Sequence, residues 1–193
     1  WQDATVFEAV AMGIGGNNYY KNCYVDLKES CLRSETTVKV FDQMRKLQSY
    51  TDEGSPGRDW NVATGMVIEG KAGFQIMGDW AKGEFTAAGK VPGVDYYCAP
   101  TPSNNGYLYN VDSFIFYKTS DPDKQEGQKL LAKLMMGKNF QKVFNLYKGS
   151  IPARLDVPMD EFDKCAKTSN SDIKTAGASG GLVPSFAHGM AQG

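Results

Sequence analysis

Residues 69–80 read EGKAGFQIMGDW, and the fold interpretation starts from this stretch. A helical pattern over residues 60–69 ends at Gly70, because glycine is common just after the last turn of a helix. Residues 73–77 then predict a short buried strand, and the Gly-Asp-Trp at 78–80 leads into another short helix. Helices and strands continue to alternate along the chain, which predicts an α/β fold.

Further strands are predicted at residues 96–100 and 107–117. The run VDSFIF at 111–116 is too apolar for an exposed edge and favours an interior strand. The glycine cluster at 13–16 matches neither the dinucleotide nor the P-loop spacing, and is interpreted as a helix stop and turn. The predicted helices cover residues 3–12, 34–47, 121–135, 140–147 and 158–167.

Composition and charge narrow the class of protein. The 193 residues carry 21 basic and 22 acidic side chains, for a net charge of −1, which argues against nucleic acid as a partner. No apolar run is long enough to span a membrane. The chain begins at Trp1 without an initiator Met or a leader and ends in small residues, so we expect both ends to be cut from something longer.

The four cysteines are expected to form two disulfides, which indicates an oxidising compartment. Cys23 and Cys31 are close enough in sequence to close a short loop, which leaves Cys98 to pair with Cys165. A zinc site is the first alternative, but there is no Cys-x-x-Cys pair, and the lone His188 is far from any cysteine. Four unpaired buried thiols are the second alternative.

No catalytic constellation is recognisable. The single histidine has no nucleophile elbow or cysteine-histidine signature to accompany it, so we expect no enzyme, no catalytic residue, no cofactor and no metal ion.

Trp80, Asp112, Lys148 and His188 each lie beside a glycine or at a segment end, where a side chain can face a cleft. As a set they suit a hydroxyl-rich ligand, because an indole packs on the C–H face of a sugar while charged groups hydrogen-bond its hydroxyls. Taken singly, each has an ordinary structural explanation, such as a core aromatic, a turn residue or a solvated helix end.

Three separated segments carry a resemblance to a known family. Residues 69–80, residues 111–118 (VDSFIFYK) and residues 149–158 (GSIPARLDVP) resemble, in order and spacing, the periplasmic sugar-binding proteins of ABC importers. The similarity is greatest to the glucose/mannose-binding proteins of Gram-negative bacteria. It implies a periplasmic-binding-protein-like fold of two lobes, a monosaccharide, expected to be glucose, between them, and a membrane permease as partner.

The resemblance also implies roles for the four candidate residues. Trp80 would stack on the sugar, Asp112 would bind sugar hydroxyls, and Lys148 and His188 would donate hydrogen bonds.

The same resemblance divides the chain into three parts. Residues 1–110 would form the main part of the second lobe. Residues 111–155 would hold a hinge strand and helices that pack on a first lobe missing here, and residues 156–193 would return to the second lobe. A sub-micromolar receptor needs roughly −8 kcal/mol of binding free energy. Because contacts from the first lobe are missing, we expect the isolated chain to bind glucose weakly or not at all.

Two other functions remain open at this point. One is the binding of another small polar solute, such as an amino acid or an oligosaccharide. The other is a hydrolase, which would need two carboxylates facing each other across a pocket.

Overall fold

The computed structural model describes residues 1–103 and 106–189, and within them the chain is mainly helical. The two short strands, β1 (Tyr107–Tyr109) and β2 (Leu182–Pro184), form a parallel pair in which Tyr107 lies opposite Leu182. The longer helices are α1 (Gln2–Tyr20), α3 (Glu35–Gln48), α4 (Trp60–Ile68), α6 (Pro122–Met135), α7 (Lys138–Lys148) and α8 (Lys164–Ala178). Shorter helical elements are η1 (Lys21–Val25), α2 (Glu29–Leu32), η2 (Asp79–Ala81), α5 (Lys82–Ala87) and α9 (Phe186–Gly189).

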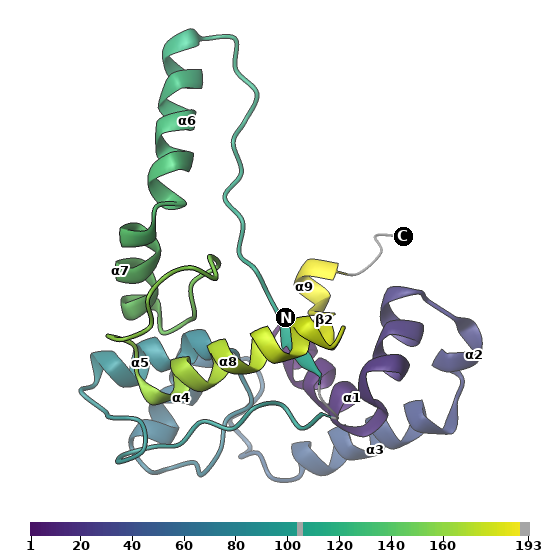
Figure 1. Ribbon diagram of the computed structural model, residues 1–193. Coiled ribbons are helices and arrows are strands. Elements are labelled where there is room, and N and C mark those ends of the chain that lie inside the picture. Colours follow the sequence, from purple (N-terminus) through teal and green to yellow (C-terminus); the bar gives the residue numbers. More distant parts are fainter. Residues whose placement is uncertain (104–105, 190–193) are drawn as a thin grey trace.

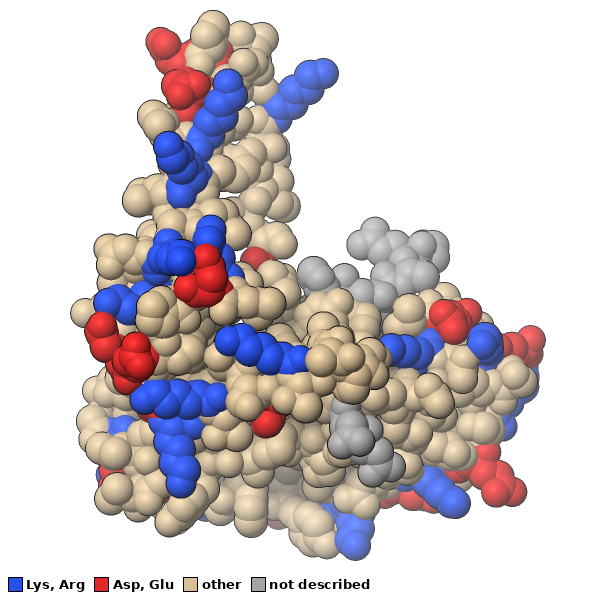
Figure 2. Space-filling model, viewed as in Figure 1, with Lys and Arg blue, Asp and Glu red and all other residues tan. Residues whose placement is uncertain are grey.

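The elements form two groups, with an arm that projects from one of them (Figure 1). Helices α1, α2 and α3 lie at one side, and α4, α5 and α7 lie at the other, with α8 passing between. The arm consists of α6 and the extended segment 110–120, which stand away from the rest of the molecule. Acidic and basic side chains are interspersed over the face that Figure 2 shows.

The main hydrophobic core lies where α1 packs on α3. Met12, Tyr20 and Val40 are fully buried there, and Val183 of β2 joins them. The ring of Phe186 stacks on Tyr20, with 5.6 Å between the centroids, so α9 is fastened to the same core. A smaller core of Val157, Phe162 and Ala166 lies beside α7 and the start of α8.

Both predicted disulfides are confirmed. Cys23 pairs with Cys31 across a Cα–Cα distance of 5.2 Å, and Cys98 pairs with Cys165 across 5.8 Å. The alternative of four unpaired thiols is therefore wrong. The second bridge ties the long loop after α5 to α8, across 67 residues of sequence.

Several predicted helix ends are also confirmed. Ser34 caps α3 by accepting a hydrogen bond from the Thr37 N–H, and Asp121 caps α6 in the same way. Gly70 and Gly149 follow α4 and α7 with positive φ angles, the conformation in which glycine ends helices at the least cost.

The predicted strands at 73–77 and 96–100 are wrong as strands, and of the strand predicted at 107–117 only residues 107–109, which form β1, are confirmed. In the described residues the unconfirmed segments are extended or irregular, apart from one isolated bridge between Tyr96 and Pro92. Phe74 is 95% exposed and Ile115 is 78% exposed, so neither run is interior. A strand needs a neighbouring backbone to hydrogen-bond with, and of the described segments only β1 and β2 supply one to each other.

Two helix boundaries also differ from the prediction. The predicted break at residues 13–16 is confirmed in part, because Gly16, with φ of 72° and ψ of −177°, forms a kink in α1, but helical geometry resumes after it and continues to Tyr20. Pro158 does not begin a helix. Helix α8 begins at Lys164 instead, because the Asp163 side chain accepts the hydrogen bond from Ala166 N–H that caps it.

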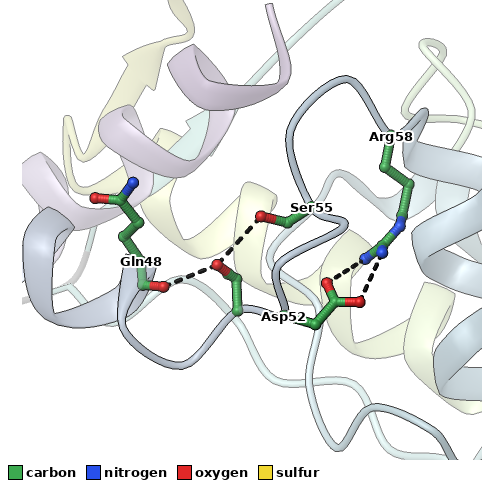
Figure 3. Close-up of polar contacts among 5 residues, drawn as sticks. Gln48, Asp52, Ser55 and Arg58 are labelled. Carbon is green, nitrogen blue, oxygen red and sulfur yellow. Dashed lines mark hydrogen bonds and ion pairs between the residues drawn. The ribbon is translucent and has the colours of Figure 1, made fainter.

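The loop from α3 to α4 is closed by its own polar contacts (Figure 3). Arg58 donates two hydrogen bonds to the Asp52 carboxylate, at 2.8 and 2.7 Å, and this contact lowers the pKa of Asp52. The Ser55 hydroxyl bonds to that of Thr51, which in turn donates to the Gln48 carbonyl. The loop thus connects the end of α3 to Trp60, where α4 begins.

None of the helices in the described part of the chain is long and apolar enough to cross a membrane.

Candidate functional site

Trp80 lies in η2, and its ring folds back over the preceding glycine. A Cβ atom at Gly78 would come within 2.0 Å of a ring carbon of Trp80, so any other residue there would displace the ring. The Trp80 ring also lies beside that of Trp1, with 6.5 Å between the ring centroids and an interplanar angle of 49°. The structure therefore places a second, 69% exposed indole next to the predicted stacking residue.

Asp112 and Lys148 lie in direct contact, although 36 residues separate them. The Lys148 ammonium donates to the Asp112 carboxylate. Lys148 is the last residue of α7, and Asp112 lies in the extended segment after β1. The Lys148 side chain is 28% exposed and the Asp112 side chain is 62% exposed, so a ligand can reach both.

Two polar residues that the sequence reasoning missed extend this pair toward β2 and α9. The Asn110 amide donates to Asp112 at 3.3 Å, and its carbonyl oxygen accepts from the Ser185 hydroxyl at 3.2 Å. Ser185 is buried, and its N–H donates to the Tyr109 carbonyl. Asn110 stands two residues before Asp112, and this proximity is the only signal that could have indicated it.

His188 lies in α9, and its side chain is outside the described residues. The helix that carries it is held by Glu8 of α1, whose carboxylate accepts a hydrogen bond from the Phe186 N–H at 2.7 Å. Burial raises the pKa of Glu8, and the hydrogen bond from the Phe186 N–H opposes that rise.

A second group of charges includes Asp79, which directly precedes Trp80 in η2. Asp79 accepts a hydrogen bond from the Ile151 N–H at 3.2 Å, and the buried Lys82 pairs with Asp163 at 2.5 Å. Burial raises the pKa of Asp79, against hydrogen bonds from Ser150 and Ile151 and the nearby charges of Lys82 and Lys148. These groups were not predicted as site residues, and nothing in their local sequence distinguishes them from a solvated surface.

Two open apolar grooves have volumes of about 560 Å³ each; the first lies between α6 and α7, and the second lies on α7 alone. Leu134, Phe140 and Val143 line the first, while Phe144, Tyr147 and Lys148 contribute to the second. Lys148 therefore stands at the boundary between an apolar surface and the polar cluster of Asp112 and Asn110. In the described part of the chain, no group of three or more histidine, cysteine or acidic side chains is arranged to hold a metal ion.

Comparisons with known proteins agree with one another. Residues 2–170 match the sequence profile of a family described as bacterial extracellular solute-binding protein. The chain is 48% identical over 192 residues to a probable sugar-binding periplasmic protein of Brucella suis, a match that covers 99% of this chain and 45% of that protein.

Two further relatives are similar to this chain over almost its whole length. A probable sugar-binding periplasmic protein of Rhizobium meliloti is 47% identical, with 99% and 46% of the two chains covered. An uncharacterized ABC transporter extracellular-binding protein of Pyrococcus horikoshii is 32% identical, with 99% and 42% covered. The chain thus spans a little less than half the length of the curated relatives it matches.

Proposed function

The chain belongs to the bacterial extracellular solute-binding proteins, and on this premise we propose that it is part of the sugar-binding component of an ABC importer. In this role it holds a monosaccharide, with glucose as the expected sugar, reversibly and without chemical change. The whole protein then presents the sugar to a membrane permease in the periplasm. It is a binding protein and not an enzyme.

The contact between Lys148 and Asp112 is the observation that carries this proposal. A carboxylate can accept hydrogen bonds from two neighbouring hydroxyls while an ammonium beside it donates to a third oxygen. Trp80 adds an indole face for the C–H side of the ring, and His188 adds a further donor. Such a mixture of donors, acceptors and one aromatic face suits a polyhydroxylated ring.

Two further observations support the proposal. Four relatives at 46–48% identity are named as probable sugar-binding periplasmic proteins, and the two disulfides suit an oxidising compartment such as the periplasm.

We also propose that residues 1–110 and 156–193 belong to one lobe, while residues 111–155 pack on another. The apolar side chains of the arm support this division, since Phe114, Ile115 and Leu130 are 60–78% exposed in the chain by itself. Exposed apolar surface of this extent marks an interface. More than half the length of the relatives lies outside the match, and that portion would supply the covering lobe.

Titration with sugars, followed by the amide and indole signals in NMR spectra, tests the proposed function. We expect glucose to shift the Trp80 indole signal, with weak affinity in the chain by itself. Galactose, mannose, xylose and an amino acid complete the panel, because a stronger response to one of them would assign a different solute.

Substitutions at the ion pair sharpen this test. Lys148→Met and Asp112→Ala should each weaken the glucose response by about tenfold or more, since hydrogen bonds to charged groups contribute about 1.5–3 kcal/mol. Lys142→Met is the matched control, because Lys142 lies on the same helix but pairs with Glu161. An unchanged glucose response in both site variants would contradict the assignment of the site.

A further inference from the structure

Asp79 joins the segment that carries Trp80 to the segment that follows Lys148. Its Oδ2 accepts the Ile151 N–H at 3.2 Å, across 72 residues of sequence. Asp79 is the first residue of η2 and directly precedes Trp80, whereas Ser150 and Ile151 come directly after Gly149 at the end of α7. The carboxylate therefore acts between elements and not as a cap of its own helix.

The backbones of the same two segments meet at a pair of glycines. A Cβ atom at Gly83 would lie 2.8 Å from the Lys148 carbonyl oxygen, and one at Gly149 would lie 2.5 Å from the Gly83 nitrogen. Gly149 also has a φ of +89°, a conformation that other residues adopt only with strain. The start of α5 and the end of α7 thus touch without an intervening side chain, so a small displacement of one changes its alignment with the other.

We propose that Asp79 is a positioning residue for the sugar site. By holding residues 150 and 151, it keeps the Gly83–Gly149 contact closed, and so fixes the Lys148–Asp112 pair relative to the Trp80 ring. Asp79 acts through these residues and does not itself touch the sugar. The inference rests on the proposed function, because it concerns the geometry of that same site.

The Asp79→Ala and Asp79→Asn variants of this chain separate positioning from charge. Asn keeps a side-chain oxygen that can accept from Ile151, whereas Ala keeps none. In NMR spectra we expect the cross-relaxation between the Gly83 amide proton and the Gly149 Cα protons to disappear in Asp79→Ala and to persist in Asp79→Asn. We expect Asp79→Ala to need at least about tenfold more glucose for the same Trp80 indole shift, and Asp79→Asn to stay within about threefold of the wild type.

Gly83→Ala provides an independent route to the same displacement. Alanine favours a helix over glycine, which offsets part of the cost of moving the backbone that a Cβ at Gly83 would meet. The added methyl group would nevertheless push away the Lys148 carbonyl, and we expect a weaker glucose response in a well-folded chain.

Asp95→Ala is the matched control, because the Asp95 carboxylate also accepts a backbone N–H, that of Val91 at 2.8 Å, but in a loop outside the cluster. It should change neither the Gly83–Gly149 signal nor the glucose response. If Asp79→Ala keeps both, or if Asp79→Asn fails to restore them, the positioning role is wrong. The absence of a glucose response both in the wild-type chain by itself and in a protein that also holds the covering lobe would count against the proposed function, while the Gly83–Gly149 signal still decides the role of Asp79.

Discussion

The α1–α3 region and the arm formed by residues 110–120 and α6 both carry many apolar side chains but differ in burial. In the first region Met12, Tyr20 and Val40 are fully buried, and the Cys23–Cys31 bridge closes the connection that follows α1. In the arm, Ile115 and Leu130 are 78% and 60% exposed. In both regions the apolar pattern indicates which side chains favour burial. Within the described part of this chain, only those of α1 and α3 are buried against other apolar side chains.

The largest difference between the two regions is expected in the free energy of unfolding that is lost when an apolar side chain is truncated. Met12→Ala removes a fully buried side chain, so we expect a loss of about 2–5 kcal/mol in the free energy of unfolding. Leu130→Ala in α6 should stay within about 0.5 kcal/mol, because its side chain is already exposed. Urea unfolding measures both values. A comparable cost for Leu130→Ala would mean that the arm is packed in solution.

The buried Glu8 carboxylate in α1 should make the stability of the fold depend on pH. Burial raises the pKa of Glu8 above its ordinary value of 4.5, so its contribution to stability is present below that pH and is lost as pH rises through the raised value. The stability of the wild type minus that of Glu8→Gln should therefore be greater at pH 4.5 than at pH 7.5. Thermal unfolding at the two pH values measures this difference.

Glu126→Gln, on the exposed helix α6, is the control for that comparison. It should stay within about 0.5 kcal/mol of the wild type at both pH values. A pH-independent difference between the wild type and Glu8→Gln would show that the Glu8 carboxylate is solvated.

The smallest effect is expected from a polar substitution in the extended part of the arm. Ile115→Ser should change the free energy of unfolding of this chain by less than about 0.5 kcal/mol, because the side chain is 78% exposed. In a protein that also holds the covering lobe, the same substitution should destabilise measurably. Equal effects in the two settings would contradict the proposal that residues 111–155 pack on another lobe.

Local signals were sufficient to predict several elements of the fold. Ser34 and Asp121 cap their helices through side chains only a few residues from the N–H groups they bond, and Gly149 ends α7 through its own backbone conformation. The predicted strands at 73–77 and 107–117 could not be judged in this way, because a strand depends on a partner that is distant in sequence or outside the described chain, and only residues 107–109 find one.

The candidate site could likewise be predicted only in part from local sequence. The resemblance to sugar-binding proteins selected Asp112 and Lys148, but their mutual contact depends on how α7 packs, which no local pattern reports. Asn110, Ser185 and Asp79 were missed for this reason, since each gains its place in the cluster only through contacts with distant segments. The roles of Trp80, Asp112, Lys148 and His188 as sugar ligands all stay predictions.

The extended backbone of the arm has a consequence for how the chain behaves at high concentration. Residues 114–117 (FIFY) combine strong β propensity with exposed side chains and a main chain free of regular strand pairing, which is a template for intermolecular sheet formation. Asp112 and Lys118 place one charge of each sign at its two ends, and such flanking charges restrain aggregation. A substitution that neutralises Asp112 to probe sugar binding would thus also remove one of these flanking charges. The aggregation of such a variant should therefore be followed by light scattering alongside its affinity for sugar.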